Sequence, residues 1–366
     1  MKKRIVTVLA LCVMLCACNT PGATETNAVQ PQTAAETPAP TAEPIEEEEV
    51  VSLLEVQTPA SDATDAPTMP PTPIPTPSPE PTPEPTPTPS GLLGGRFPDK
   101  FSDEPILEER SYKSQSISIS ITSHTDTNKK KETTTYHVAD IYVQDVTLIQ
   151  TASAENDFTK KYAHPVEQIA SRVGALLAID GDTYSHMSNS IVLRNGELYR
   201  NKLENGADLC VLYRDGRMET KKWGTFTLEE IVESDPWQVW SFGPALLDEN
   251  GKAMTDITYK RLARENPRAA IGYYEPGHYC FVIVEGRLKG MTDGLTFDQL
   301  SALMEKLGCK VAYNLDGGGS AQMYWVNGIM SKSSNSNRWV SDIIYILPEG
   351  PLPPMTTAQP QASPED

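Results

Sequence analysis

The chain has 366 residues, a net charge of −18 and 31 prolines, most of which lie in the first hundred residues. Residues 1–95 hold 12 acidic and 3 basic residues, which leaves 37 acidic and 28 basic residues for the rest. A folded part that is mildly acidic and has no basic stripe excludes nucleic acid as the expected partner. The crowding of proline predicts fewer domains than the length alone would allow.

The first seventeen residues have the three parts of a bacterial export signal. A positive end at Lys2–Arg4 precedes the apolar run Ile5–Met14. This run is shorter than the ~20 residues that span a bilayer, so we interpret the segment as a cleaved signal. Leu15-Cys16-Ala17-Cys18 resembles the lipobox, in which the cysteine receives lipid and becomes the first mature residue. We predict a signal peptide over 1–17 and lipidation of Cys18. The alternative is a plain signal peptide that ends in cysteines.

Two predicted disordered segments flank the folded part. Residues 18–95 are rich in Thr, Pro, Ala and Glu and have almost no aromatic side chains, so they cannot bury enough apolar surface to offset the entropy of folding. Within them, Pro71–Pro89 alternates proline with Thr, Ser or Glu. This pattern favours polyproline II at about 3.1 Å per residue, a reach of roughly 60 Å. Residues 349–366 are predicted to be a second loose tail.

Residues 96–348 have the pattern of a single α+β domain. Ser116–Ile121 alternates polar and apolar residues, as a half-buried strand does. Ile191–Leu193 and Leu198-Tyr199 flank the turn Asn195-Gly196, which predicts a hairpin. Further turn pairs punctuate apolar runs along the domain. We therefore expect a mixed, largely antiparallel β-sheet core built from hairpins.

A few helices are expected to flank this core. The apolar residues of Pro165–Val173 recur at helical spacing, with Pro165 at the first helical position. Thr296–Leu307 is predicted to be a helix with a Thr296–Gln299 capping box and a stop at Gly308.

Three cysteines remain once the signal is removed and Cys18 is lipidated: Cys210, Cys280 and Cys309. Export permits disulfides, so one bridge with one free thiol is one interpretation. Three buried, inert thiols are the other. A thiol-redox or zinc–cysteine function is not expected from this set.

The stretch Tyr313–Ser320 is the most unusual in the domain. It follows the apolar run Val311-Ala312, so a strand is expected to deliver Asp316 to the end of a sheet. Gly317, Gly318 and Gly319 then allow the backbone to approach a ligand closely and point N–H groups at an anion, with a hydroxyl from Ser320. The alternative is a tight turn in which glycine only supplies positive φ.

Two further stretches carry polar residues at the edges of apolar strands. Leu176–Ile179 is followed by Asp180, Gly181 and Asp182, and two acids this close repel unless one is protonated, metal-bound or paired with a cation. The alternative is an Asp-Gly turn with solvated acids. Arg268 precedes a strand of small apolar residues, and its planar guanidinium is suited to clamp a phosphate.

Five ordered motifs together resemble the phosphodiester glycosidase family, which removes a sugar such as N-acetylglucosamine from a phosphodiester. The resemblance runs from about Tyr112 to Ile346. One position departs from the family pattern, because Asp180 stands where the family usually has asparagine. The five matching segments are Ala178–Tyr184, Phe242–Pro244, Pro267–Gly272, Asn314–Ser320 and Arg338–Ile344.

The resemblance implies hydrolysis of a sugar-1-phosphodiester without a required cofactor. In this scheme Arg268 and the N–H groups of Gly317 to Gly319 hold the phosphate, and Asp316 and Asp182 are the carboxylates around the sugar, with Asp180 beside them. Asn314 and Ser320 orient the sugar or the acids. Gly181 and Arg338 complete the expected substrate site.

Three questions about this scheme stay open. His186 lies beyond the second motif as a weaker candidate acid or base. A divalent cation could be held by Asp180, Asp182 and Asp316, although no ligand spacing requires one. The alternatives to hydrolysis are a non-catalytic module that binds an envelope glycan and a transglycosylase of exopolysaccharide maturation.

The export signal and spacer predict where the protein acts. The lipid predicts either an anchor in a Gram-positive membrane or the periplasmic face of a Gram-negative one. The long spacer favours the former, a lipid-anchored protein on the extracellular face of the membrane. Its expected partners are a glycan or sugar-phosphate substrate of the cell envelope and the membrane itself.

Overall fold

The computed structural model describes residues 93–204, 206–257, 263–332 and 338–356. The predicted signal peptide, the lipidation site Cys18 and the tether up to residue 92 lie outside these ranges, as do residues 357–366. Within the described ranges, no helix has the length and apolar character needed to cross a bilayer.

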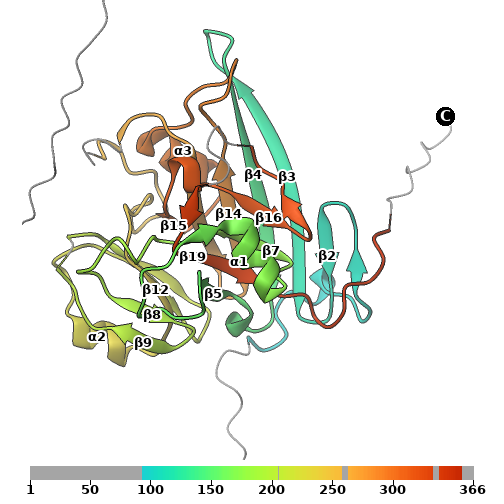
Figure 1. Cartoon of the computed structure of the whole chain (residues 1–366), viewed down its shortest axis with the longest axis horizontal. Helices are drawn as coiled ribbons and strands as arrows, with labels where there is room; N and C mark the ends of the chain where they lie inside the picture. The colour runs from blue at the N-terminus through green and yellow to red at the C-terminus, as the bar shows by residue number, and fades with distance from the viewer. Residues whose placement is uncertain (1–92, 205, 258–262, 333–337, 357–366) are drawn as a thin grey trace, which may run out of the picture. The chain divides into compact units, whose positions relative to one another are not determined.

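A seven-stranded sheet is the largest sheet of the described residues (Figure 1). Its order is β1-β2-β3-β4-β14-β13-β15, and every neighbouring pair is antiparallel. The long hairpin of β3 and β4 extends beyond the rest of the domain (Figure 1). The strands are β1 (Ile106–Leu107), β2 (Ser111–Lys113), β3 (Ile117–Thr127), β4 (Thr133–Val143), β13 (Arg268–Glu275), β14 (His278–Val284) and β15 (Val311–Asn314).

Two five-stranded sheets and one two-stranded sheet complete the β-structure. The first has the order β11-β10-β12-β8-β9, the second β17-β16-β7-β19-β5, and the third pairs β18 with β6. Their strands are β5 (Gln150–Ser153), β6 (His164–Pro165), β7 (Leu177–Asp180), β8 (Val192–Arg194), β9 (Glu197–Arg200), β10 (Leu209–Tyr213), β11 (Met218–Lys221), β12 (Pro236–Trp240), β16 (Met323–Trp325), β17 (Gly328–Ile329), β18 (Trp339–Val340) and β19 (Asp342–Ile346).

The helices are short and lie outside the sheets. The α-helices are α1 (Val166–Val173), α2 (Leu228–Glu233) and α3 (Phe297–Lys306), and the 3-10 helices are η1 (Pro98–Lys100), η2 (Val146–Leu148) and η4 (Gly318–Ser320). The predicted capping box is confirmed at α3, where Thr296 accepts from Gln299 N and Gln299 accepts from Thr296 N. The first predicted helix is confirmed as α1, except that Pro165 caps it rather than occupying its first position.

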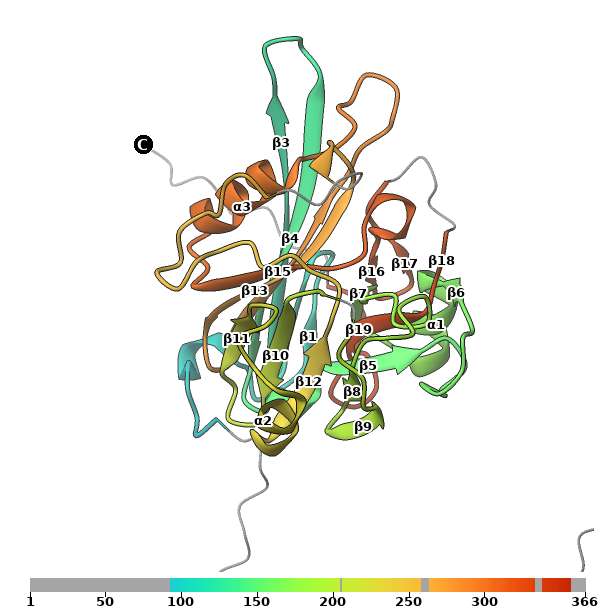
Figure 2. The ribbon, with the colours of Figure 1, turned by 90° about the vertical axis from the view of Figure 1, so that its left-hand side faces the viewer.

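The core lies between the seven-stranded sheet and the two five-stranded sheets. One cluster of buried residues joins Ile141 and Phe281 of the large sheet to Trp240 of β12 and Ile344 of β19. The opposite face of the large sheet is covered by α3 through a second cluster that includes Phe297 and Leu300 (Figure 2). The predicted largely antiparallel β-sheet core with few helices is therefore confirmed for the described residues, and it is consistent with the α+β class.

The edge of the folded part differs from the prediction at its C-terminal end. Glu349 accepts hydrogen bonds from Ser116, and Thr356 N donates to Leu107 O over 2.9 Å. Residues 349–356 therefore pack against β1 and the residue that precedes β3. The boundary that we predicted between the domain and its loose tail, at residue 349, is too early in the chain. At the other end, Leu93 N already donates to Gln144 O over 2.8 Å.

All three cysteines of the domain are buried free thiols, which matches the second of the two interpretations. The Sγ atoms of Cys280 and Cys309 lie 3.7 Å apart. Both occupy the space that a side chain at Gly272 would fill.

Candidate active site

Backbone and side-chain hydrogen bonds bring the five motifs together. Asp316 N donates to Gly181 O over 3.0 Å, and Gly181 N donates to Asp342 O over 3.0 Å. Asn314 Nδ2 donates to Gly243 O, and Gly318 N donates to Pro267 O, both over 2.8 Å. The segments after β7 and β15 and the start of β19 therefore meet at one end of their strands.

Asp182 is held in a buried ion pair. Its Oδ1 accepts from Arg194 Nη2 over 2.7 Å, and its Oδ2 accepts from Ser241 N over 2.8 Å. Asp182 is 1% exposed and Arg194 is fully buried. Because both carboxylate oxygens are occupied and shielded from solvent, Asp182 is placed to anchor the site. This differs from the predicted role, in which Asp182 faces the sugar.

Arg194 is the charge around which the acids are arranged. It was missed in the sequence because a lone arginine at the end of a hairpin strand has no local signature. Its guanidinium also donates to Val239 O and lies 3.5 Å from Asp342 Oδ2. Burial opposes its charge, but Asp182 and Asp342 outweigh burial and raise its pKa above the ordinary value.

Asp342, at the start of β19, is a second acid that the sequence analysis did not single out. It is fully buried, and a Cβ on Gly181 would lie 2.5 Å from its Cγ. Glycine at position 181 is therefore required to make room for this carboxyl group. Burial, followed by the charge of Asp182, raises the pKa of Asp342 to about 8 despite the attraction of Arg194.

Asp180 occupies the position where the family usually has asparagine. It is fully buried at the end of β7; Gln322 N donates to its Oδ1 over 3.3 Å, while its Oδ2 has no hydrogen-bond partner. Burial raises the pKa of Asp180 well above the usual range, and the nearby Asp316 raises it further. A carboxyl group that stays protonated has one donor and one acceptor, which are the two functions of an asparagine amide.

Asp316 is the most accessible acid of this cluster, at 9% exposed. Gly317 N donates to its Oδ1 over 2.8 Å, which orients the carboxylate. Among Asp180, Asp182, Asp316 and Asp342, it is the group best placed to meet a ligand from outside.

Two backbone N–H groups of the glycine loop, Gly317–Gly319, already donate hydrogen bonds within the protein. The N–H groups of Gly317 and Gly318 donate to Asp316 and to Pro267 O, so they are less available to an anion than the sequence analysis predicts. Gly317 leaves no room for a side chain, because a Cβ there would lie 2.9 Å from Pro267 O. Gly318 has a φ of 65°, a conformation that favours glycine.

Two buried polar atoms beside this loop have no hydrogen-bond partner. They are the hydroxyl of Ser320 and Oδ1 of Asn314. Unpaired buried polar groups cost stability and are uncommon in native proteins, so these two atoms are candidates to bond a substrate. Both residues were predicted to orient the sugar or the acids.

The contacts of Arg268 differ from those expected of a phosphate clamp, which is its predicted role. Its Nε donates to Leu295 O over 2.8 Å, its Nη2 donates to Arg264 O over 2.7 Å, and its guanidinium lies over the ring of Phe297. Burial, and then the charge of Arg287, lower its pKa to about 10. Arg268 is therefore placed to fix the entry to β13 rather than to reach an anion in solvent.

Arg287 is the exposed arginine beside the glycine loop. A Cβ on Gly318 would lie 3.3 Å from its Nη1, and its Nη2 donates to Asn266 Oδ1. Its backbone φ is 59°, uncommon for a residue with a side chain. The Glu285–Arg287 stretch after β14 carried no signal that would separate Arg287 from other surface arginines.

The remaining predicted residues lie at the margins. His186 is exposed, with Nδ1 3.3 Å from Thr183 Oγ1 and 3.2 Å from Ser185 Oγ. Arg338 is exposed where the chain enters β18. Within the described residues, no three His, Cys, Asp or Glu side chains are grouped to hold a metal ion, so the proposed cation site gains no support from the arrangement.

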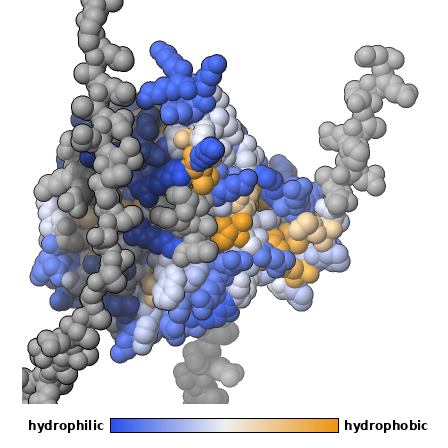
Figure 3. All heavy atoms as spheres, turned by 45° about the horizontal axis from the view of Figure 1, so that its top comes forward, coloured by the Kyte–Doolittle hydropathy of each residue, from blue (hydrophilic) through white to orange (hydrophobic). Residues whose placement is uncertain are grey.

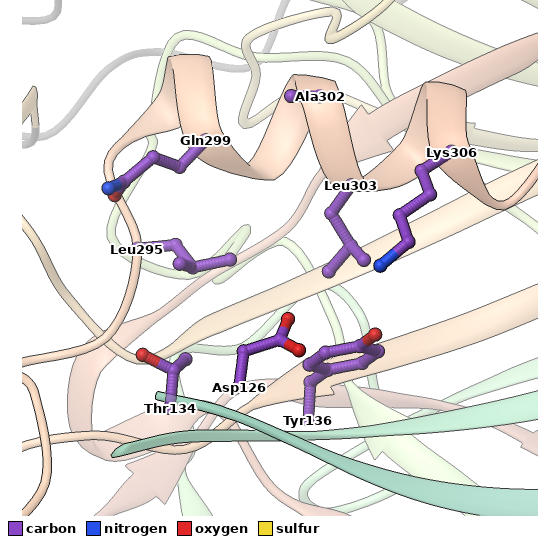
Figure 4. A pocket seen from close by; sticks show the side chains of 8 residues that line it. All are labelled: Asp126, Thr134, Tyr136, Leu295, Gln299, Ala302, Leu303 and Lys306. Atoms are coloured by element: carbon purple, nitrogen blue, oxygen red, sulfur yellow. The ribbon is translucent and has the colours of Figure 1, made fainter. Parts of the chain in front are cut away.

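A pocket of about 230 Å³ lies between α3 and the β3–β4 hairpin, apart from the acid cluster. Figure 4 shows Lys306 of α3 facing Asp126 and Tyr136 across it. The face in Figure 3 is mostly hydrophilic, with separate hydrophobic patches. None of the pocket's lining residues belongs to the five motifs.

Comparison with known proteins agrees with the motifs. Residues 173–347 match the model of the family described as phosphodiester glycosidase. The catalytic domain of zebrafish N-acetylglucosamine-1-phosphodiester alpha-N-acetylglucosaminidase, auto-inhibited by its pro-peptide, superposes with a TM-score of 0.54 and 19% identity. The match covers 67% of this chain and 88% of the zebrafish domain. The two proteins share a fold, and the predicted resemblance is confirmed over the matched residues.

Two other proteins are also similar to parts of this chain. The SPbeta prophage-derived uncharacterized protein YomE of Bacillus subtilis strain 168 is 26% identical over 163 residues. This match covers 43% of the chain but only 25% of that protein's length. A hypothetical protein from Synechocystis matches with a TM-score of 0.48 and 11% identity, over 64% of this chain and 62% of that one.

Proposed function

We propose that this phosphodiester glycosidase-like domain hydrolyses a sugar-1-phosphodiester, of the kind in which N-acetylglucosamine is linked through phosphate to a second group. The supporting observation is the meeting of Asp316 with the glycine loop and the exposed guanidinium of Arg287. One site thus presents a carboxylate for a sugar and a cation for a phosphate.

The phosphate side of the reaction uses Arg287. Planar guanidinium groups bind phosphate with paired, charge-assisted hydrogen bonds. When the bond between C1 of the sugar and the phosphate oxygen breaks, the electron pair leaves with the phosphate, and water supplies the new oxygen at C1. Positive charge and donors at the departing oxygen stabilise that transition state.

The sugar side uses Asp316. Its carboxylate activates water or attacks C1, the two roles that carboxylates have in glycoside hydrolysis. Asp180 stands beside it as a neutral acid, which avoids a second negative charge next to Asp316. Asp182, Arg194 and Asp342 hold the loops in place.

The proposed substrate belongs to the cell envelope. The predicted export signal, the predicted lipid on Cys18 and the proline-rich sequence that follows support a location on the outer face of the membrane. Such a position suits anchored glycans or exopolysaccharide. We propose no resident cofactor for this reaction.

One observation favours a second candidate, a module that binds a glycan without cleaving it. Glycosidases usually act through two carboxylates that flank the bond, and here Asp182 is enclosed in its ion pair. Transfer to a sugar hydroxyl in place of water is a variant of the first proposal. Product formed only when a glycan acceptor is added would indicate transfer.

The test uses the full-length protein with UDP-N-acetylglucosamine and with a methyl phosphodiester of N-acetylglucosamine-1-phosphate. Free sugar is measured for the parent, for Asp316→Asn and for Asp215→Asn, which changes an exposed acid outside the site. We expect release by the parent and by Asp215→Asn, and none above background by Asp316→Asn.

Equal release by all three proteins would contradict the role of Asp316. No release by any of them, together with measured binding of the phosphodiester, would support the binding module.

A further inference from the structure

The side chain of Trp339 is unusually exposed. It is 63% accessible, more than any other large hydrophobic side chain among the described residues. It lies in β18, which pairs with β6 at the side of the domain near α1 (Figure 2). Trp is large and is usually buried to a high degree, so an indole in solvent at a defined position is a candidate for ligand binding.

The surrounding residues hold this indole in place. Trp339 is opposite Pro165 in the strand pair, and its ring centroid is 5.8 Å from that of His164, at an interplanar angle of 50°. His164 is itself fixed by a 2.6 Å hydrogen bond to Glu155. The next residue, Val340, is 3% exposed and packs into the core. The backbone under the indole is therefore anchored.

The indole is connected to the acid cluster by two residues of chain. Val340 and Ser341 separate it from Asp342, a distance of about 10 Å for extended chain. The hydroxyl of Ser341 is hydrogen-bonded to that of Ser185, in the segment that follows the Asp180–Tyr184 motif. Trp339 is thus linked through buried chain to the segments that carry the acids.

The chemistry around Trp339 is that of a sugar site. An indole face packs against the C–H groups of a pyranose ring, while neighbouring polar groups bond its hydroxyls. Here the polar groups are the exposed Arg338, which precedes Trp339 in the chain, and the half-accessible carboxylate of Glu155, which is hydrogen-bonded to His164. One aromatic ring among polar groups differs from the broad apolar patch of a typical protein or membrane contact.

We infer that Trp339 and His164 form an aromatic subsite that stacks a sugar ring of an oligomeric glycan, on the same domain as the proposed active site. This inference rests on the proposed function and sharpens it. A second sugar subsite on this domain selects a substrate with several sugar units over a single sugar nucleotide.

The test measures binding separately from hydrolysis. Asp316→Asn in the full-length protein is titrated with the hexamers of β-1,4-linked N-acetylglucosamine, glucose and mannose, and tryptophan fluorescence and calorimetry are recorded. The same titrations are made with Trp339→Ala added, with Trp339→Phe added, and with Trp223→Ala added as a matched exposed control. Circular dichroism checks that each variant is folded.

We expect at least one hexamer to bind and to change the fluorescence. Loss of a stacked ring weakens binding by about three- to tenfold, so Trp339→Ala lowers the affinity by that factor. Trp339→Phe recovers part of it, and Trp223→Ala has no effect. Binding of the matching monomer is unaffected by Trp339→Ala.

The inference is overturned if no hexamer binds, or if Trp339→Ala and Trp223→Ala bind equally well. Either result would reject the subsite even if the parent protein hydrolyses the simple phosphodiester. Conversely, a Trp339-dependent glycan complex in a protein without hydrolytic activity would retain the subsite and reject the proposed hydrolysis.

Discussion

The acid cluster around Arg194 and the glycine loop, Gly317–Gly319, lie side by side, but their charged groups differ in burial. Around Arg194, the buried carboxylate of Asp182 compensates the guanidinium charge, and Asp342, whose pKa is raised to about 8, lies 3.5 Å away. At the glycine loop, Asp316 and Arg287 are the charged groups nearest to solvent. A buried charge that has lost water must be matched within the protein, whereas the exposed guanidinium of Arg287 and the slightly accessible carboxylate of Asp316 are left to interact with a ligand. The first region supports the site and the second meets the substrate.

The largest expected effect is that of Asp316→Asn on activity. Removal of a group that acts in acid–base or nucleophilic catalysis lowers the rate by about 10²–10⁴-fold. The free energy of unfolding should change little, because Asp316 is outside the buried ion pairs. Initial rates of sugar release and urea denaturation check the two parts. A rate within about threefold of the parent would remove Asp316 from the mechanism, because general acid–base groups contribute far more than that.

Arg194→Met should have the largest effect on stability. It leaves the carboxylate of Asp182 buried without its cation, and breaking such a pair costs about 3–5 kcal/mol. Chemical denaturation of the full-length protein measures the loss. Arg217→Met is the matched control, because Arg217 is an exposed residue that pairs with Asp215 and Glu219. Equal stability of the two variants would contradict the buried ion-pair account.

Arg287→Ala should lower kcat/KM by about tenfold to a hundredfold, since one charge-assisted contact to a phosphate is worth about 1.5–3 kcal/mol. Arg287→Lys keeps the charge but not the paired geometry, so it should recover only part of the rate. Lys289→Ala removes a neighbouring exposed cation and serves as the control. An unchanged kcat/KM for Arg287→Ala would assign the phosphate to another group.

Asp180→Asn should have the smallest effect on activity, because a protonated Asp180 already has the donor and acceptor of an amide. Its effect on stability depends on pH. The folded-state pKa is raised, so the folded protein keeps a proton that the unfolded chain loses above about pH 4, and stability falls as pH rises through this window. The groups that face Asp180 are Asp316, Asp342 and the backbone of Gln322.

The measurement is urea denaturation of parent and Asp180→Asn at about pH 4.5, close to the ordinary carboxyl pKa, and at about pH 8. We expect the variant to gain stability over the parent at the higher pH. A gain of the same size at both pH values would mean that Asp180 is not held protonated.

The sequence predicted those features that depend on local pattern. The Asn195-Gly196 hairpin and the α3 capping box follow from short-range rules, and both are present. The loops with Asp180 and Asp316 were identified because glycine beside an acid is an uncommon local pattern. Their proximity followed from the family resemblance rather than from the residues.

The partners of each charge could not be predicted. Arg194 reaches Asp182 from another strand, and Arg268 and Arg287 differ only in which atoms surround them. Both are arginines near the end of an apolar strand in the sequence. The choice between an anchoring and a ligand-binding role is made by tertiary contacts, as it is for the burial of Asp342.

The central claim, that Asp316 meets the substrate while Asp182 supports the fold, is tested most directly by comparing Asp316→Asn with Asp182→Asn. Sugar release from the methyl phosphodiester and the free energy of unfolding are measured on both full-length variants. The account predicts that Asp316→Asn is stable and inactive, and that Asp182→Asn is destabilised while its folded fraction retains activity. A stable, inactive Asp182→Asn beside an active Asp316→Asn would contradict it.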